Sequence, residues 1–189
     1  MKSVAKHARF IFLLVLVLVV GSAGTACADV ELSRVFESET GLSFRYPADW
    51  ELGIRYETGN SILVEVATKS AYARVSVACD FNILEEARKD NADDYLQGFA
   101  EAIELDGDEN ATCGKIETAG VEAAFWQTKE RATSRSLRQK RIVMGRKEDA
   151  LFTLSSTLMI GPAFGTEAEI ADSARIIEAI EASLRIERE

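Results

Sequence analysis

The chain has 189 residues, of which 31 are acidic, 22 are basic and one is histidine, and its net charge at pH 7 is −9. This length suits a single domain, and the acidic balance argues against general nucleic-acid binding. The histidine, His7, lies in a stretch that we expect to be removed, so Ser-His pairs, Cys-His pairs and His-containing zinc sites are excluded from the remainder.

Residues 1–28 have the three parts of an export signal. Lys2, Lys6 and Arg9 form a charged start, an apolar run covers 10–20, and small residues follow. The apolar run is shorter than the roughly 20 residues of a membrane-spanning helix, so we predict a signal peptide. Three of the 22 basic residues and none of the 31 acidic ones lie there, which leaves 19 basic and 31 acidic residues, a net charge of −12.

The end of this signal leaves two destinations open. Residues 26–28, Ala-Cys-Ala, fit the cleavage site of a periplasmic or secreted protein. Residues 24–27, Gly-Thr-Ala-Cys, form an imperfect lipobox, because Gly24 stands where leucine is usual. The second interpretation predicts a bacterial lipoprotein anchored through Cys27, and only in that case do we expect a membrane contact.

The first half of the remaining chain has the pattern of β-strands. Residues 29–40 are predicted to be a short acidic leader, and one domain is expected to span 41–189. Alternating apolar residues predict strands at 41–46, 51–57, 61–67 and 72–79.

The apolar period then changes from two residues to about 3.6. Asn91 is a suitable cap for a helix that reaches about Leu105. The apolar stripe of this helix consists of Tyr95, Leu96, Phe99 and Ile103. Further strands are expected near 112–119, 121–129, 136–145 and 150–158.

A final helix is predicted after Thr166, which forms a capping box with Glu169. The complete order is a run of strands with one helix in the middle and one at the end. This order indicates an α+β fold in which helices cover a largely antiparallel β-sheet.

Residues 41–50 read Gly-Leu-Ser-Phe-Arg-Tyr-Pro-Ala-Asp-Trp. This motif resembles the start of PsbP-like domains, and the element order over 41–186 is similar as well. The resemblance implies an α/β/α sandwich and, for most members, binding without catalysis, in photosystem assembly, Ran-dependent nuclear import or the bacterial envelope. It carries over no catalytic residue.

The residues of this motif are expected to be structural. Phe44, Tyr46 and Trp50 are the kind of side chains that anchor a core. Pro47 ends the strand and fixes a turn, because it has no backbone N–H to donate.

Cys79 and Cys113 are a candidate disulfide. In an oxidising compartment, cysteines separated by one helix-sized segment favour a bridge, which would stabilise the fold by up to about 4 kcal/mol. The alternative is that Cys79 is a small core residue and Cys113 a separate thiol.

Residues 106–117 follow the first predicted helix and are acidic. Oxygen-bearing side chains stand where an EF-hand loop has calcium ligands, namely at Asp106, Asp108, Asn110 and Glu117. Ala111 occupies the position where that loop needs glycine, and β-prone residues follow where it needs a helix. We therefore interpret the loop as a solvated connection and keep calcium binding as an alternative.

Residues 129–147 hold eight basic side chains against one acid, Glu130. The basic residues are Lys129, Arg131, Arg135, Arg138, Lys140, Arg141, Arg146 and Lys147. On a shared face they would bind phospholipid headgroups, another anionic polymer such as a phosphorylated polysaccharide, or an acidic envelope protein. The alternative is a solvated hairpin whose charges prevent aggregation.

The candidate partner-binding residues of this hairpin are Arg138, Lys140 and Arg141. Strand alternation sends Arg138 and Lys140 to one face and Arg141 to the other. The sequence as a whole predicts an exported, non-catalytic binding or assembly protein of the bacterial cell envelope with no cofactor. A calcium or ligand sensor and a carboxylate-based glycan hydrolase are the alternatives.

Overall fold

The structure is a computed structural model that describes residues 30–83 and 91–187. The predicted signal peptide, 1–28, and its possible lipidation site, Cys27, lie outside the described residues. Within those residues, neither helix has the length and apolar character that crossing a bilayer requires.

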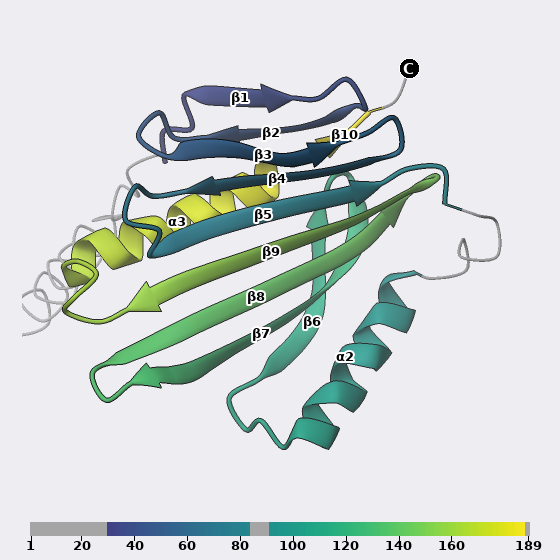
Figure 1. Cartoon of the computed structure of the whole chain (residues 1–189). Coiled ribbons are helices and arrows are strands. Elements are labelled where there is room, and N and C mark those ends of the chain that lie inside the picture. Colours follow the sequence, from purple (N-terminus) through teal and green to yellow (C-terminus); the bar gives the residue numbers. More distant parts are fainter. Residues whose placement is uncertain (1–29, 84–90, 188–189) are drawn as a thin grey trace, which may run out of the picture.

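The described residues form a seven-stranded sheet and a three-stranded sheet with two helices, as expected for an α+β fold (Figure 1). All neighbouring strands are antiparallel. In spatial order the large sheet consists of β3 (Glu51–Glu57), β4 (Ser61–Ala67), β5 (Ala73–Asp80), β9 (Ala150–Ile160), β8 (Ser136–Lys147), β7 (Val121–Thr133) and β6 (Thr112–Thr118). Seven of the eight strands predicted from the sequence therefore form one antiparallel sheet.

The small sheet has the order β1 (Arg34–Glu37), β2 (Leu42–Tyr46) and β10 (Arg185–Ile186). Strand β1 lies inside the predicted leader, 29–40, so the domain begins earlier than residue 41. Its one buried residue, Phe36, packs on Phe44 with ring centroids 5.2 Å apart. A four-residue strand with one inward side chain has too little alternation to be recognised.

Two helices lie on opposite faces of the large sheet. Helix α2 (Ala92–Asp106) packs on β6, β7 and β8, and helix α3 (Glu167–Ser183) packs on β2, β5, β6 and β9 (Figure 1). Both helices begin with a capping box. The sequence predicts the box at Thr166 and, at Asn91, the cap alone.

The core lies between α3, the small sheet and one face of the large sheet. Strand β4 alternates completely and buries Ile62, Val64 and Val66 on this face. Leu42 of the 41–50 motif is buried, and so are the four residues expected to be structural, Phe44, Tyr46, Pro47 and Trp50. Phe44, Tyr46 and Trp50 belong to the hydrophobic core, as expected of side chains that anchor it.

The structure corrects the predicted disulfide. Cys79 and Cys113 are both free, and their strands, β5 and β6, stand four strand spacings apart in the sheet. At about 4.8 Å per spacing they are separated by about 19 Å along the sheet, whereas a disulfide needs Cα atoms within about 7 Å. Cys79 is instead a small core residue, which was the alternative interpretation, because it is fully buried in the core.

We expect the two thiols to react very differently with iodoacetamide. Burial raises the pKa of Cys79 to about 12, so this thiol is both inaccessible and protonated, whereas Cys113 is half-buried. Peptide mapping by mass spectrometry should find Cys113 alkylated in the native protein and Cys79 alkylated only in denaturant. A Cys79–Cys113 linked peptide in the absence of reductant would contradict the structure.

Candidate functional site

The face of the large sheet opposite α3 carries polar side chains from several neighbouring strands. Helix α2 covers it over β6, β7 and β8, and neither described helix packs on it over β4, β5 and β9. Polar side chains line its centre, where Ser76 is the cross-strand neighbour of Ser155 and Arg74 is the cross-strand neighbour of Thr157. We call this surface the open face.

Four cations cross the open face from β3 to β8, and we call them the basic strip. They are Arg55, Arg74, Arg138 and Lys140. Each has a side chain that is between 38% and 59% exposed. They are therefore available to a partner while part of each side chain lies against the sheet.

The first half of the basic strip is organised by Glu65 of β4. The Arg55 guanidinium donates to Glu65 Oε1 at 2.7 Å, and the Arg74 guanidinium donates to Glu65 Oε2 at 3.4 Å. Burial of Glu65 acts to raise its pKa, but the two arginines outweigh it and hold the pKa below its ordinary value. Glu65 therefore stays ionised and orients both guanidinium groups.

The second half is organised in the same way by Glu130 of β7. Glu130 Oε1 lies 2.9 Å from the Lys140 ammonium and 2.5 Å from Arg138 Nε. Lys140, and with it Arg138, holds the pKa of Glu130 below its ordinary value. Each half thus combines two cations with one carboxylate, so a positive charge remains uncompensated in each.

The two halves meet at β9. Arg74, Thr157 and Lys140 are direct cross-strand neighbours on β5, β9 and β8, so about 10 Å separates the strands of the two cations. The Thr157 hydroxyl lies between them and can donate a hydrogen bond. This arrangement suits a ligand that carries negative charges at intervals along its length.

Arg141 does not belong to the basic strip. As strand alternation predicts, it faces α3, where its guanidinium donates to the Glu181 carboxylate at 3.1–3.4 Å and to Gln127 at 2.9 Å. It also lies 4.3 Å from the centroid of the Phe125 ring. Its surroundings correct the prediction that Arg141 binds a partner, because its cationic head is used inside the fold.

Glu181 is 2% exposed, which is unusual for a carboxylate. Burial raises its pKa, although Arg141 acts in the opposite direction and Glu178 adds a smaller increase. The Thr118 hydroxyl binds the Glu181 carbonyl oxygen at 2.7 Å. Glu181 therefore joins the C-terminal part of α3 to β8 through Arg141 and to β6 through Thr118.

The loop considered for calcium has another role. The Asp108 carboxylate accepts from the Thr128 hydroxyl at 2.6 Å and from the Asn110 backbone at 3.0 Å, and these bonds lower its pKa. Asp106 ends α2, and Glu117 lies in β6, which takes the place of an exiting helix. Across the described parts of the chain, no three His, Cys, Asp or Glu side chains gather where they could hold a metal.

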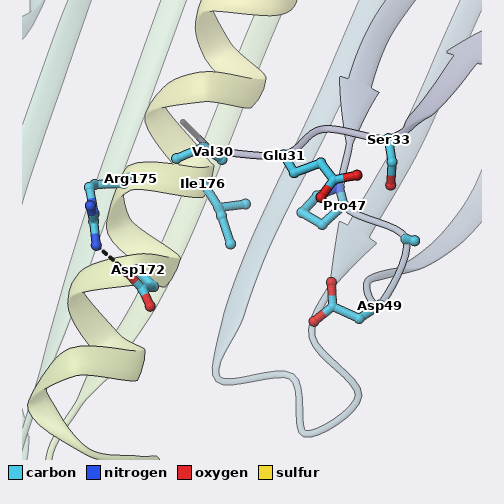
Figure 2. A pocket seen from close by; sticks show the side chains of 9 residues that line it. Val30, Glu31, Ser33, Pro47, Asp49, Asp172, Arg175 and Ile176 are labelled. Atoms are coloured by element: carbon cyan, nitrogen blue, oxygen red, sulfur yellow. Dashed lines mark hydrogen bonds and ion pairs between the residues drawn. The ribbon is translucent and has the colours of Figure 1, made fainter. Parts of the chain in front are cut away.

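A cleft of about 450 Å³ opens between residues 30–33, the β2–β3 turn and α3 (Figure 2). Pro47 and Ile176 supply apolar walls, and Asp49 stands across the cleft from the Asp172–Arg175 ion pair. The three charged side chains are exposed to solvent. Among its described residues, the cleft therefore offers no desolvated charged group that would fix the orientation of a ligand, unlike the partly buried carboxylates of the open face.

Sequence reasoning identified half of the basic strip. Arg138 and Lys140 were found because they belong to a dense basic segment. Arg55, Glu65 and Arg74 were missed, although the alternation of β4 and β5 does place Glu65 and Arg74 on the polar face. The missing information was the strand order, which brings β5 next to β9 and within two strands of β8.

No protein-family model and no curated protein matches the chain significantly. Solved structures that resemble it include a protein from Bacteroides thetaiotaomicron, with 14% identity and a TM-score of 0.49. The alignment covers 84% of this chain and 50% of that protein, so this chain spans about half the length of that protein.

Two further similar structures have a length close to that of this chain. The cyanobacterial PsbP of Synechocystis is 11% identical with a TM-score of 0.47, and the alignment covers 86% of this chain and 98% of PsbP. The Ran-binding protein Mog1p of Saccharomyces cerevisiae is 8% identical with a TM-score of 0.48, covering 81% of this chain and 94% of Mog1p. PsbP is thus among the solved structures that this chain resembles.

Proposed function

We propose that the chain is an exported, non-catalytic binding protein of the bacterial cell envelope, whose basic strip holds an extended anionic partner. The observation that carries the proposal is the strip itself. In a chain of net charge −9, four partly exposed cations lie on one open face of a sheet and are oriented by two carboxylates. Export is supported by the signal pattern of residues 1–28.

The dimensions of the basic strip favour a linear ligand over a single small anion. From β3 to β8 the strip crosses four strand spacings, which is about 19 Å. On the described part of the open face, the Thr157 hydroxyl lies between Arg74 and Lys140, and the Ser76 and Ser155 hydroxyls lie beside the strip; all three can donate to ligand oxygens. A phosphorylated polysaccharide has charges and acceptors repeated along such a length, so it is the partner class that we propose.

The proposal is tested by neutralising the two hairpin cations of the strip. Long-chain polyphosphate serves as the probe, and binding is measured by fluorescence anisotropy over a series of salt concentrations. We expect Arg138→Gln with Lys140→Gln to weaken binding about tenfold, equivalent to about 1.4 kcal/mol, and to reduce its salt dependence.

The hairpin offers a matched control on its opposite face. Lys129 and Arg131 of β7 are exposed and alternate with Glu130, so Lys129→Gln with Arg131→Gln removes the same charge from the neighbouring strand of the hairpin. Binding that falls equally in both double variants would show general charge attraction and would refute a role for the strip. Vesicles of anionic phospholipid, tested in parallel, would show whether a lipid surface binds in place of a polymer.

A further inference from the structure

Strand β3 is an edge of the large sheet that nothing in the described chain covers. It pairs with β4 only, and all seven of its residues are exposed. Three of them are large and apolar, with Leu52 37%, Ile54 53% and Tyr56 47% exposed. An exposed apolar edge strand presents free backbone groups and is a template for pairing with another strand.

The side chains of β3 divide between the two faces of the sheet. Leu52 and Ile54 are opposite Val66 and Val64, so they extend the apolar face on which the core is built. Glu51 is opposite Ala67 on the other face, and Arg55 also lies on that face because it reaches Glu65. One face of β3 therefore carries an apolar pair of side chains, and the other face carries a pair of opposite charge.

We propose that two copies of this chain associate through antiparallel pairing of their β3 edges, with Gly53 on the two-fold axis. In this register Leu52 lies opposite Ile54 of the second copy, and Glu51 lies opposite Arg55 of the second copy. Both kinds of contact occur twice by symmetry. Nothing within 4 Å of Gly53 obstructs the approach of a second strand at the axis.

Other registers of the same pairing are less favourable. Centring the axis on Ile54 would place Glu51 opposite Glu57 of the second copy, and directly opposed like charges destabilise a sheet. A shift of one residue would place Leu52 opposite Arg55, because it exchanges the two faces. Charge complementarity therefore selects the register centred on Gly53.

The same strand limits the assembly to a dimer. The pairing of β3 with β4 is irregular between Ile54 and Tyr56, so the regular edge is short. A two-fold contact also uses the β3 edge of both copies at once, which closes the assembly. The short paired region predicts a weak dimer that forms at high protein concentration.

Sedimentation equilibrium of the protein as its host produces it tests this dimer over a wide concentration range. We expect a monomer–dimer equilibrium that Ile54→Lys abolishes and that Glu51→Arg weakens about tenfold, because it opposes Arg55 of the second copy. Glu57→Arg is the matched control, since it makes the same charge change on the same strand and should not weaken the dimer. Thermal melting confirms that each variant is folded.

Three outcomes would overturn the proposal. The protein could remain monomeric at the highest concentration, which would leave β3 to a different molecule. A dimer could persist in both Ile54→Lys and Glu51→Arg, which would place the interface elsewhere. Equal effects of Glu51→Arg and Glu57→Arg would contradict the register centred on Gly53.

Discussion

Replacing Arg141 by alanine is expected to destabilise the protein by about 3–5 kcal/mol near pH 7.5, as measured by urea unfolding. The substitution removes the guanidinium that binds the Glu181 carboxylate and leaves that carboxylate almost completely buried. An ionised carboxylate without a partner is costly in a protein interior, and this cost accounts for most of the expected loss.

The destabilisation caused by Arg141→Ala should be smaller at about pH 5 than near pH 7.5. Burial raises the pKa of Glu181 above its ordinary value of 4.5, and Arg141 opposes this rise. A carboxyl group whose pKa is raised by folding stabilises the folded state when protonated, and this contribution is lost as the pH rises through the folded-state pKa. Removing Arg141 raises that pKa further, so the variant can protonate Glu181 at low pH and avoid a buried charge.

A double substitution separates the ion pair from simple packing. Arg141→Met with Glu181→Leu replaces both charges by apolar side chains of similar size. We expect the free energy of unfolding of this double variant to be much closer to that of the unsubstituted protein than the value for Arg141→Ala is. A loss below about 1 kcal/mol for Arg141→Ala at pH 7.5, or one that does not change with pH, would contradict the role given to this pair.

The fold could be predicted further than the site because its signals are local. Alternation marks eight of the strands, and side-chain capping marks both helices at Asn91 and Thr166 within the described chain. Strands β1 and β10 were missed because four and two residues are too few to show a period.

The site depends on which strands become neighbours, and the sequence pattern does not specify that. Alternation correctly places Lys140 and Arg141 on opposite faces of the sheet, because this prediction depends only on the pattern within one strand. Placing Lys140 beside Thr157 and near Arg74 requires β9 to insert between β5 and β8. The same order of strands separates Cys79 from Cys113, so one missing fact explains both the overlooked half of the basic strip and the incorrect disulfide.

Replacing Gly145 by alanine is expected to destabilise the protein by about 2–3 kcal/mol, because it overfills the core. Gly145 of β8 is the cross-strand neighbour of Phe152, whose ring lies over the glycine. A Cβ atom at position 145 would lie 2.8 Å from Phe152 Cε1 and 2.9 Å from the Ala123 Cβ atom. Phe152 and Ala123 are both fully buried, so neither has free space into which it can move.

Gly98 provides the matched control, because a Cβ atom there would meet nothing within 4 Å. It lies inside α2, where Gly98→Ala should stabilise the protein by about 0.5–1 kcal/mol in the same urea measurement. Phe152→Leu should reduce the cost of Gly145→Ala, since a smaller side chain leaves room for the added methyl group. If the effects of Gly145→Ala and Phe152→Leu on the free energy of unfolding simply add, the close approach of the Phe152 ring is not the reason that position 145 needs glycine.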